Sequence, residues 1–389
     1  MRIGLLTDAY DSVLGGITNF LVLHKKALEA LGHEPFIFTF GPKDSYDEES
    51  RVVRSSGIPI ADSGYYFNLG FSERARRLCR TMDILHTQYP FLTGQLAIHY
   101  GTRYHIPVVF TNHIRGDLYA RHNLPGVPEG LEVALWETYL RLFARQCELI
   151  ICPSLEICDL IRGYGVTARI EFIPNGIEVE RFQEPPWRQD RAKLGIPESA
   201  KILMYVGRLA AVKNLAFLLQ AFAAVTSLLP DTYLMLVGEG PEQDNLQDQA
   251  RRLNLGERVI FTGKVSYDDV PAYLAIADAF VTASVTEVHP LSVLEAIAAG
   301  LPVLGVDSPG VGETIVHERN GLLSSSDIAE FSVQLYRLMS DNRLRARLAQ
   351  QARADSAQYD IRTTTRQMVS CYEEVIASYQ AQQRSARKR

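Results

Sequence analysis

The sequence has no long hydrophobic run, no excess of positive charge and few cysteines. None of its apolar stretches approaches the length of about 20 residues that a membrane-spanning helix needs. The formal net charge is −5, whereas nucleic-acid binders usually carry a basic excess, so no nucleic-acid partner is expected. The cysteines number five and lack the paired spacing of a metal site, which is typical of reduced thiols in a cytosolic protein. Residues 1–8 predict a short strand rather than a signal peptide. A soluble, cytoplasmic protein is therefore expected.

The chain also lacks the short motifs of common cofactor sites. The first predicted strand is followed by Gly15 and Gly16 but not by Gly-x-Gly-x-x-Gly, which disfavours a nicotinamide dinucleotide. There is no Gly-Lys-Ser/Thr of a nucleotide-binding P-loop. No Asp-x-Asp follows a predicted strand, and no His/Cys cluster occurs. We therefore expect neither a metal nor a cofactor.

What the chain does contain is a regular alternation of short apolar runs with amphipathic helical stretches. Continuous Val/Ile/Leu runs are typical of parallel strands covered on both faces, and their alternation with helices predicts doubly wound sheets. Strands are predicted at 2–7, 34–39, 84–87, 107–111, 149–152 and 171–173, and again at 202–206, 233–237, 258–262, 279–283, 302–305 and 321–323. In the first half, helices are predicted at 17–31, 72–82, 93–104 and 129–146.

The two halves repeat this plan, so the sequence predicts an α/β protein of two Rossmann-like domains. We place them at 1–180 and 181–360, because the polar and proline-containing residues 182–187 interrupt the pattern. The final helix, about 361–383, is long enough to leave the second domain and pack on the first. Ligands of such sheets bind beyond the carboxyl ends of the strands, and we expect the site in a cleft between two facing domains.

The most informative stretch lies between Glu287 and Glu295. The preceding residues 279–284 predict a buried strand and residues 291–299 a helix, which puts Glu287 in the loop and Glu295 about one turn into the helix. Two such carboxylates can accept hydrogen bonds from several hydroxyls, and the helix N-terminus can hold an anion beside them. A ligand that presents hydroxyls next to a phosphate is typically a nucleotide sugar. The alternative is an ordinary helix start, where glutamate suits the helix dipole.

Cations and glycines follow other predicted strands. Arg208, directly after Gly207, and Lys213 flank a predicted helix N-terminus, which favours a diphosphate site over solvated surface charges. The Gly15-Gly16 turn allows close approach to a ligand, although a plain tight turn is equally compatible with it. The same two alternatives hold for Gly238, which could approach a base or ribose.

His113 ends a predicted buried strand, a position that favours a functional role over a structural one. Arg115 and Asp117 follow in the same loop and are candidates for the acceptor side. Ser154 and the pair Asn175-Gly176 mark further strand ends, for which we expect only caps and turns.

These motifs, in this order, resemble the family 4 glycosyltransferases, which have the GT-B fold. The resemblance is carried by Gly207-Arg208-Leu209 with Lys213-Asn214, by 238–241, and by Glu287 and Glu295 in a Glu-x7-Glu motif that continues to 303. Gly15-Gly16, His113 and 174–177 support it in the first half. One departure is Val288-His289-Pro290, where many relatives have Gly or Phe, and this position bears on sugar specificity.

The resemblance implies a role for each matching residue. Arg208 and Lys213 would neutralise the donor diphosphate, and Gly16 would approach it from the other domain. Glu295 would hold the ribose hydroxyls. Glu287 would bind hydroxyls of the transferred sugar, helped by backbone N–H groups of Val288, His289, Pro290 and Leu291. His113 would lie near the sugar and the leaving phosphate. The first domain would bind the acceptor and the second the nucleotide sugar.

The resemblance also implies a hexosyltransferase that retains anomeric configuration and needs no metal. Glycosyl transfer passes through an oxocarbenium-like state while negative charge builds on the diphosphate, and cations with helix N-termini would stabilise that charge. No Asp or Glu is assigned as a covalent nucleophile, so a front-face substitution is the hypothesis. UDP-glucose is the expected donor, because it is the commonest among such enzymes.

A membrane lipid is the expected acceptor. Residues 72–80 form a basic amphipathic stretch that suits an anionic membrane surface, with a solvated helix face as the alternative. Residues 112–119, 137–141 and 152–154 resemble the corresponding parts of enzymes that glycosylate diacylglycerol. This predicts peripheral contact with the inner face of the cell membrane through Arg74, Arg76, Arg77 and Arg80. A soluble or polysaccharide acceptor, an inactive sugar-nucleotide-binding module and a nucleotide-sugar epimerase remain the alternatives.

Overall fold

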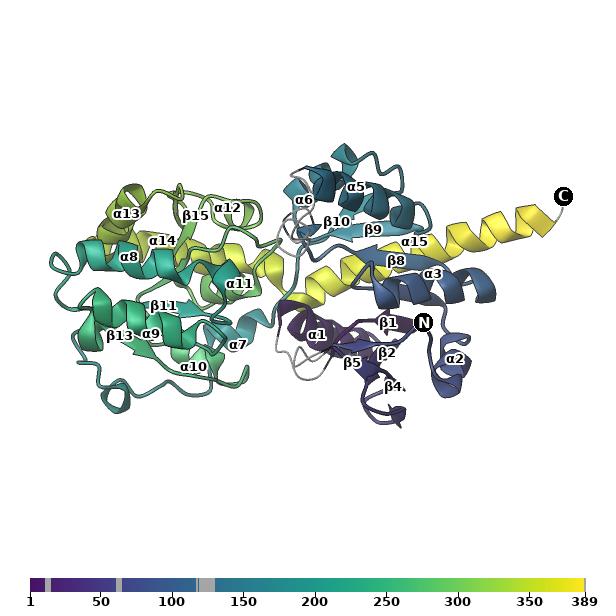
Figure 1. The fold of residues 1–389 in the computed structure, drawn as a ribbon, viewed down its shortest axis with the longest axis horizontal. Coiled ribbons are helices and arrows are strands. Elements are labelled where there is room, and N and C mark those ends of the chain that lie inside the picture. The colour runs from purple at the N-terminus through teal and green to yellow at the C-terminus, as the bar shows by residue number, and fades with distance from the viewer. Residues whose placement is uncertain (11–14, 61–64, 117, 119–129, 388–389) are drawn as a thin grey trace. The chain divides into compact units, whose positions relative to one another are not determined.

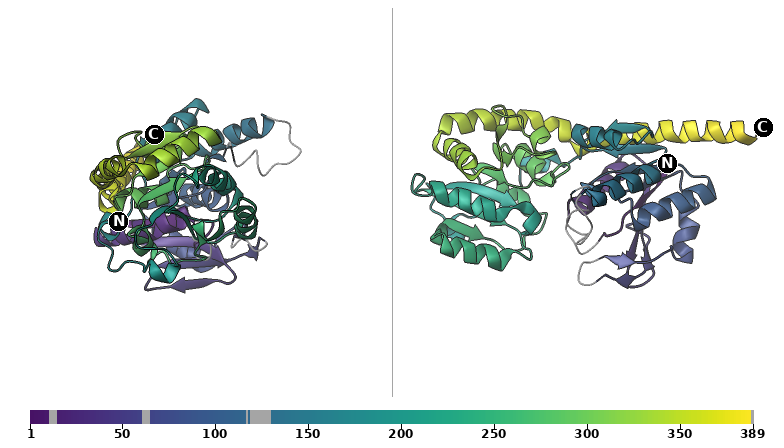
Figure 2. Two further views of the ribbon diagram at one scale, coloured as in Figure 1. Left: turned by 90° about the vertical axis from the view of Figure 1, so that its left-hand side faces the viewer. Right: turned by 45° about the horizontal axis from the view of Figure 1, so that its top comes forward.

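The structure is a computed structural model, and it describes residues 1–10, 15–60, 65–116, 118 and 130–387 (Figures 1 and 2). The chain forms two compact units. Unit 1 comprises Met1–Gly176 together with the C-terminal segment that begins at Ile361, and unit 2 comprises Ile177–Asp360. The two units divide between Gly176 and Ile177, a few residues before the boundary placed at 180/181 in the sequence, and the last helix belongs to unit 1.

Unit 1 is built on one sheet in the order β10-β9-β8-β7-β1-β2-β4-β3. All neighbours in it are parallel except β3 and β4. Strand order reverses between β1 and β7, which makes their C-terminal ends the switch point where such sheets bind ligands. The strands are β1 (Arg2–Leu6), β2 (Glu34–Gly41), β3 (Ser45–Asp47), β4 (Val52–Ser56), β7 (Ile84–Thr87), β8 (Val108–Thr111), β9 (Leu149–Cys152) and β10 (Ile170–Phe172).

The helices described in unit 1 are α1 (Gly16–Ala30), α2 (Glu73–Cys79), α3 (Leu92–Tyr104), α5 (Leu131–Ala144), α6 (Leu155–Gly163) and α15 (Ile361–Arg387). A separate antiparallel ribbon, β5 (Ile58–Pro59) with β6 (Tyr66–Phe67), follows β4. Ser154 caps α6 by accepting a hydrogen bond from Ile157 N–H at 3.3 Å, which is the structural role expected for it.

Unit 2 has the sheet order β13-β12-β11-β14-β15-β16, all parallel, which is the 3-2-1-4-5-6 order of a dinucleotide-binding fold. Its strands are β11 (Lys201–Val206), β12 (Thr232–Val237), β13 (Val259–Phe261), β14 (Ala279–Thr282), β15 (Val303–Val306) and β16 (Gly321–Ser324). Its helices are α7 (Val179–Gln183), α8 (Leu215–Val225), α9 (Gln243–Arg252), α10 (Val270–Leu274), α11 (Leu291–Ala298), α12 (Val311–Thr314), α13 (Ile328–Ser340) and α14 (Asn342–Asp355).

Burial of the apolar runs accounts for both sheets. In unit 2, Leu203 on β11 and Leu234 on β12 share one core with Phe222 on α8 and Phe331 on α13, all of them fully buried. Strands buried on both faces need continuous apolar sequence, and this made them visible in the sequence. The short strands β3 to β6 were not predicted, because polar residues and Pro59 interrupt any apolar run there.

Helix α15, yellow in Figures 1 and 2, packs against α1, and its C-terminal end projects past the rest of unit 1. A buried polar network joins the helix to the sheet. The Tyr372 hydroxyl lies 2.6 Å from His86 Nδ1 and 3.3 Å from His24 Nε2, and Thr365 Oγ1 lies 3.0 Å from His24 Nδ1. Gly176 makes the approach of this helix possible, because a Cβ there would come within 2.3 Å of Thr364 Oγ1.

Candidate active site

The loops after β11 and β14 contain most of the predicted donor residues. The two strands are neighbours, with Leu203 paired to Ala279 and Met204 to Phe280, and strand order reverses between them. The loops therefore leave the sheet side by side at the switch point of unit 2, where open α/β sheets bind ligands. Gly207 to Lys213 come from the first loop and Glu287 from the second.

An ion pair between Lys213 and Glu287 connects these two loops. Both side chains are largely shielded, with 27% and 19% of their surface exposed, so the pair is screened less than a surface salt bridge. The Ser284 hydroxyl adds a second link by donating to the Val212 carbonyl at 3.3 Å. A cation and a carboxylate thus lie together at the edge of the sheet, and their roles toward the diphosphate and the sugar stay predictions.

The backbone of Arg208 belongs to the same cluster. The Tyr205 hydroxyl donates to the Arg208 carbonyl at 3.1 Å, and burial together with the nearby Glu287 carboxylate raises the pKa of Tyr205. The Arg208 side chain is exposed and has no ion-pair partner in the part of the chain that the structure describes. It is therefore available to an anion from solvent.

Gly207 and Gly238 are explained by their own packing. Their φ angles are +153° and +132°, values that L side chains rarely adopt. A Cβ on Gly238 would come within 2.1 Å of the Gly207 carbonyl oxygen, so the loops after β11 and β12 touch backbone to backbone. This favours the structural-turn interpretation of Gly238. Its predicted contact with a base or ribose stays a prediction.

Glu295 lies in α11 and is almost completely buried. Burial raises the pKa of its carboxyl to about 7, against the opposing effects of the Tyr267 hydroxyl and the Arg181 guanidinium. Its Oε1 atom and the Tyr267 hydroxyl oxygen make no hydrogen bond of normal geometry within the described residues. An orphaned carboxylate oxygen is costly unless a ligand satisfies it, and ribose hydroxyls have the required donor chemistry.

Arg181 and Tyr267 are functional candidates that the sequence did not indicate. The Arg181 guanidinium lies over the Tyr267 ring at 5.2 Å and pairs with Asp268 at 2.6 Å and Glu178 at 3.3 Å. These residues come from α7 and from the segment before α10, far in sequence from α11. The positive charge that partly offsets the rise in the pKa of Glu295 therefore comes from outside every motif, and no local sequence pattern indicated it.

The N-terminus of α11 is formed by Val288, His289, Pro290 and Leu291, all buried. Pro290 is the N-cap residue and carries no N–H, so the backbone donors expected here reduce to those of Val288, His289 and Leu291. The His289 ring packs on Tyr359 at 5.6 Å, and burial lowers its pKa to about 3. Burial therefore favours the neutral form of its imidazole.

Gly310 is another residue that the sequence analysis missed. It precedes α12 with a φ of +79°, and a Cβ there would come within 2.4 Å of the Val288 carbonyl and 2.6 Å of the Glu287 carbonyl. Any side chain at this position would displace the loop that presents Glu287. The only signal in the sequence was the Pro309-Gly310 dipeptide, which is common to many turns.

In unit 1, Gly15 is the N-cap residue of α1 and Gly16 its first residue. Glycine has no side chain that could cap the helix, so Gly15 itself offers no side-chain acceptor to the first N–H groups of α1. The approach of this backbone to an anion stays a prediction.

His113 follows β8 at the C-terminal edge of the unit 1 sheet. Its Nε2 atom lies 2.8 Å from Gln88 Oε1, and its ring lies 5.1 Å from that of Phe20. Gln88 follows the neighbouring strand β7 and is fully buried, so it fixes both the orientation and the tautomer of His113. Arg115 is half-buried in the same segment, and Asp117 lies outside the described residues.

No cluster of three or more His, Cys, Asp or Glu side chains suited to a metal ion occurs within the residues that the structure describes. Among the same residues, no helix is both long and apolar enough to cross a membrane.

Comparison with known families agrees with this geometry. The profile "Glycosyl transferases group 1" matches residues 187–355, and the profile "Glycosyltransferase Family 4" matches residues 14–181. The chain is 32% identical over 334 residues to the alpha-monoglucosyldiacylglycerol synthase of Streptococcus pneumoniae, which covers 83% of this chain and 75% of the relative. It is 27% identical to the enzyme of the same name from Acholeplasma laidlawii, covering 78% and 80%.

Solved structures share the architecture over almost the whole chain. Anabaena HepE in complex with UDP and glucose aligns with a TM-score of 0.77 at 20% identity, covering 96% of this chain and 100% of that one. Sucrose-phosphate synthase from Thermosynechococcus elongatus aligns with a TM-score of 0.78 at 20% identity, covering 97% and 99%. At this identity the likeness establishes the fold.

Proposed function

The chain belongs to the family 4 glycosyltransferases and has their GT-B fold, and from this premise we propose that it transfers glucose from UDP-glucose to the hydroxyl of a membrane lipid such as diacylglycerol. Retention of anomeric configuration and independence of metal are parts of the same proposal. The enzyme class is that of a hexosyltransferase.

The observation that carries the proposal is the Lys213–Glu287 ion pair, which joins the loop after β11 to the loop that leads to the buried Glu295, at the switch point of unit 2. We propose that Lys213 exchanges its carboxylate partner for the donor diphosphate, with Arg208 as second cation. Glu287 is then released to accept hydrogen bonds from sugar hydroxyls. Glu295 takes the ribose hydroxyls, which satisfy its orphaned oxygen. His113 and Gly16 keep their predicted roles toward the sugar and the diphosphate.

In the proposed reaction, the bond between the anomeric carbon and the β-phosphate oxygen breaks with oxocarbenium character. The negative charge that develops on the phosphate is stabilised by the Lys213 and Arg208 cations, a preorganised electrostatic effect. A phosphate oxygen takes the proton of the acceptor hydroxyl, and the new bond forms on the same face of the sugar. A glycosyl-enzyme ester trapped in mass spectrometry would contradict this sequence of events.

A lipid acceptor is supported by two relatives of this chain, both of which are alpha-monoglucosyldiacylglycerol synthases. It is supported further by helix α2, where Arg74, Arg76 and Arg77 are exposed and Arg80 follows at the C-cap. Exposed arginines of this kind suit anionic head groups.

The proposal is tested by incubating the purified protein with UDP-glucose and diacylglycerol in mixed micelles and identifying the product by mass spectrometry. An α-configured glucolipid, seen by NMR and formed equally in the presence of EDTA, is expected. Transfer only to soluble glycans would favour the alternative acceptor. Conversion of the nucleotide sugar without an acceptor would indicate an epimerase, and absence of any turnover with intact UDP binding would indicate an inactive module.

A further inference from the structure

Two neighbouring polar atoms in unit 2 are buried and lack hydrogen-bond partners among the described residues. One is Oε1 of Glu295 on α11, and the other is the hydroxyl oxygen of Tyr267, in the segment between β13 and α10. The two side chains are close enough for each to shift the pKa of the other. Unpaired buried polar atoms are rare and costly, so two of them side by side indicate a place where a ligand completes the bonding.

The two atoms offer complementary hydrogen-bonding chemistry. An ionised carboxylate only accepts hydrogen bonds, whereas a phenol can donate one. Burial and the adjoining Glu295 carboxylate raise the pKa of Tyr267, so its hydroxyl keeps the proton that it donates. An alcohol between the two side chains would donate to Glu295 Oε1 and accept from Tyr267. A single hydroxyl group would therefore satisfy both atoms.

Arg181 on α7 holds Tyr267 in place. Its guanidinium lies 5.2 Å from the centre of the Tyr267 ring and donates to the Tyr267 carbonyl at 3.3 Å. It also donates to Asp268 at 2.6 Å and to Glu178 at 3.3 Å. Helix α7 itself packs against α10 and α11. The guanidinium, the phenol and the Glu295 carboxylate thus form one assembly, built from three separate segments of unit 2.

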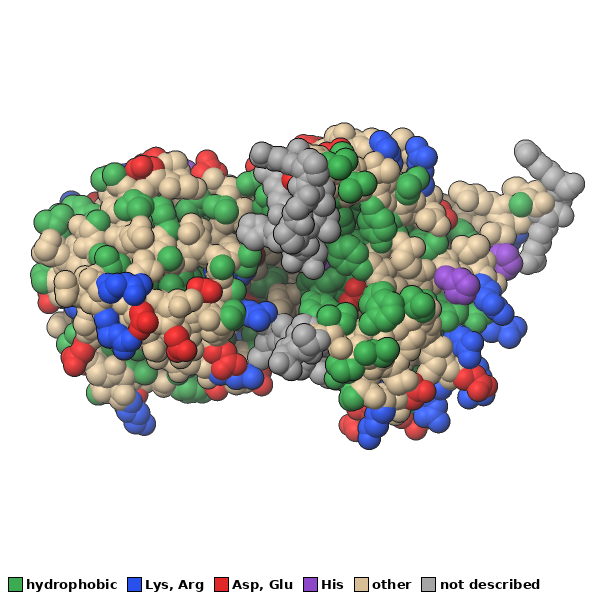
Figure 3. All heavy atoms as spheres, viewed as in Figure 1, with side chains coloured by type: hydrophobic (Ala, Val, Ile, Leu, Met, Phe, Trp, Pro, Cys, Tyr) green, Lys and Arg blue, Asp and Glu red, His purple; other side chains and the backbone are tan. Residues whose placement is uncertain are grey.

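Surface charge does not distinguish a ligand site on unit 2. Figure 3 shows acidic and basic side chains interspersed over α9, and Arg251 on this helix pairs with Asp248. Exposed pairs of this kind contribute little and specify no ligand. The buried pair of Tyr267 and Glu295 is the feature that does.

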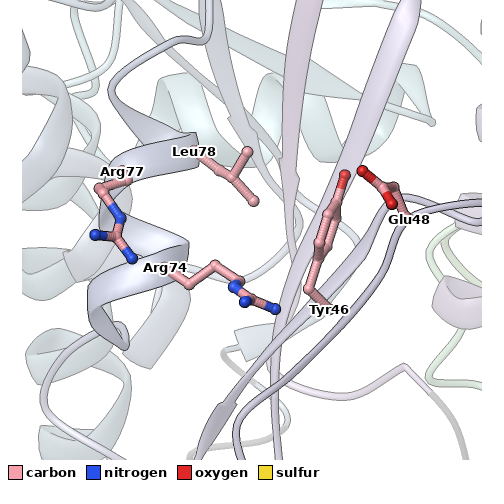
Figure 4. A pocket seen from close by; sticks show the side chains of 5 residues that line it. All are labelled: Tyr46, Glu48, Arg74, Arg77 and Leu78. Carbon is pink, nitrogen blue, oxygen red and sulfur yellow. The ribbon is translucent and has the colours of Figure 1, made fainter.

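The groove of unit 1 in Figure 4 lacks such a pair. It has a volume of about 450 Å³ and is lined by Tyr46, Glu48, Arg74, Arg77 and Leu78. Its two arginines are exposed, and within the described part of the chain none of the five residues has a buried polar atom without a partner. The polar groups of this groove can therefore be hydrated without a ligand.

We propose that Tyr267, held by Arg181, is a donor-binding residue that acts together with Glu295 on one ribose hydroxyl of the nucleotide. The ribose hydroxyl donates to Glu295 and accepts from Tyr267, which makes the site selective for a ribonucleotide over its deoxy form. A site built to hydrogen-bond a hydroxyl rejects the analogue that lacks it, because its own buried polar groups then stay unpaired. This role rests on the proposed function in one respect, namely that a nucleotide donor binds at Glu295.

The first test is calorimetric titration of the full-length protein with UDP, 2′-deoxy-UDP and 3′-deoxy-UDP at pH 8, above the pKa of about 7 of Glu295. The wild type should bind UDP more tightly than one of the two deoxynucleotides. Tyr267→Phe should weaken UDP binding by about tenfold, the effect of losing one buried hydrogen bond. The affinity of this variant for the disfavoured deoxynucleotide should equal that of the wild type.

Tyr273→Phe is the matched control, because the Tyr273 hydroxyl accepts from Gln189 Nε2 at 3.0 Å. It should bind all three nucleotides like the wild type. Equal weakening of all three by Tyr267→Phe would overturn the proposal, since the tyrosine would then support only the fold. Unchanged UDP binding in Tyr267→Phe would also overturn it, since a water molecule bound between the two atoms would then account for them. So would a wild type without any preference for UDP.

A second test concerns Arg181 as a positioning residue. Arg181→Met should reduce the preference for UDP over the disfavoured deoxynucleotide, and Arg181→Lys should restore part of it by keeping the cation. Combining Arg181→Met with Tyr267→Phe should cost no more affinity for UDP than the more harmful single change, because the two residues act as a unit. Additive losses would contradict the role of Arg181 as the support of Tyr267.

Both tests measure binding alone, which separates this role from the proposed function. A wild type that shows the hydroxyl selectivity but glucosylates no lipid would remove the proposed function and leave the role of Tyr267 intact. A wild type that glucosylates lipid, with a Tyr267→Phe variant that keeps the full preference for UDP, would remove the role of Tyr267 and leave the proposed function intact.

Discussion

At the scale of single residues, the site depends on carboxylates placed where water cannot solvate them well. Glu295 is buried with an unsatisfied oxygen, and Glu287 forms an ion pair with Lys213. Both arrangements leave the free protein with interactions that a hydroxyl-rich anion can improve. At Glu295 the ligand supplies the missing hydrogen-bond donors. At the Glu287–Lys213 pair it supplies a better anionic partner for Lys213.

Glu295 should make stability and donor binding depend on pH in opposite directions. Because burial raises its pKa from 4.5 to about 7, the folded protein keeps a proton there that the unfolded chain loses across that window. The free energy of unfolding therefore falls as pH rises from 4.5 to about 7, by up to about 3 kcal/mol. Donor binding requires the ionised Glu295 carboxylate, which accepts hydrogen bonds from the ribose hydroxyls. The affinity for the donor should therefore increase over the same range by up to about tenfold per pH unit.

Denaturant unfolding between pH 5 and 8 measures the pH dependence of the free energy of unfolding. Calorimetric titration with UDP-glucose over the same range measures the pH dependence of donor affinity. In Glu295→Gln both should flatten, because the amide does not titrate, while Glu257→Gln, an exposed position, should behave like the wild type. A Glu295→Gln variant that keeps the full pH dependence would show that another group is responsible.

Lys213→Met should slow turnover more than it weakens donor binding. Removing one preorganised charge from a developing anion costs about 3 kcal/mol, or roughly a hundredfold in kcat. Steady-state kinetics would measure this, with the exposed Lys193→Met as the control. Arg208→Ala should likewise lower kcat more than it weakens donor binding. A change confined to KM would mean that the cation holds the ground state and the transition state equally.

Only some of the site residues could be predicted from the sequence. Arg208, Lys213, Glu287 and Glu295 were predicted because each stands at a fixed distance from a strand end. Tyr267 and Gln88 were not, since they act on residues that only the folded chain brings near them. Glycines were ambiguous, and packing distances then gave Gly238 a structural explanation.

At the scale of elements, α15 is held by polar contacts inside an apolar interior. Tyr372 shares its hydroxyl between His24 of α1 and His86 of β7, and all three side chains are fully buried. The network specifies the register of the helix, because a shift by one residue would leave several polar groups unsatisfied.

Tyr372→Phe should therefore lower the free energy of unfolding by about 1–3 kcal/mol, the cost of leaving buried groups unpaired. Chemical denaturation of the full chain measures this value. Tyr379→Phe, on a less buried turn of the same helix, should change it little. Equal changes in the free energy of unfolding at the two positions would contradict the proposed role of the network.

The same network should make unit 1 sensitive to acid. Burial lowers the pKa of His24 to about 3, so its stabilising effect is complete above pH 6.5 and is lost as the pH falls from 6.5 toward 3. His86 shifts in the same direction, by burial and by its neighbours His24 and His113. Unfolding of wild type and His24→Asn between pH 4 and 7 should show a steeper loss in the wild type. Parallel curves would contradict this assignment.

At the scale of the whole molecule, both units place their candidate residues at the C-terminal edge of a doubly wound sheet. The apolar strands and the two-unit plan were predictable, because parallel strands buried on both faces leave a continuous hydrophobic signal. The short strands β3 to β6 were not, since their pairing depends on neighbours rather than on their own composition.

The most direct test of the central claim follows labelled sugar from UDP-glucose into the organic phase in the presence of diacylglycerol, for the wild type, Glu287→Ala and the exposed control Glu257→Ala. We expect the wild type and Glu257→Ala to form labelled lipid and Glu287→Ala to lose at least a hundredfold in rate. Label that never leaves the aqueous phase, or equal rates for all three proteins, would contradict the account.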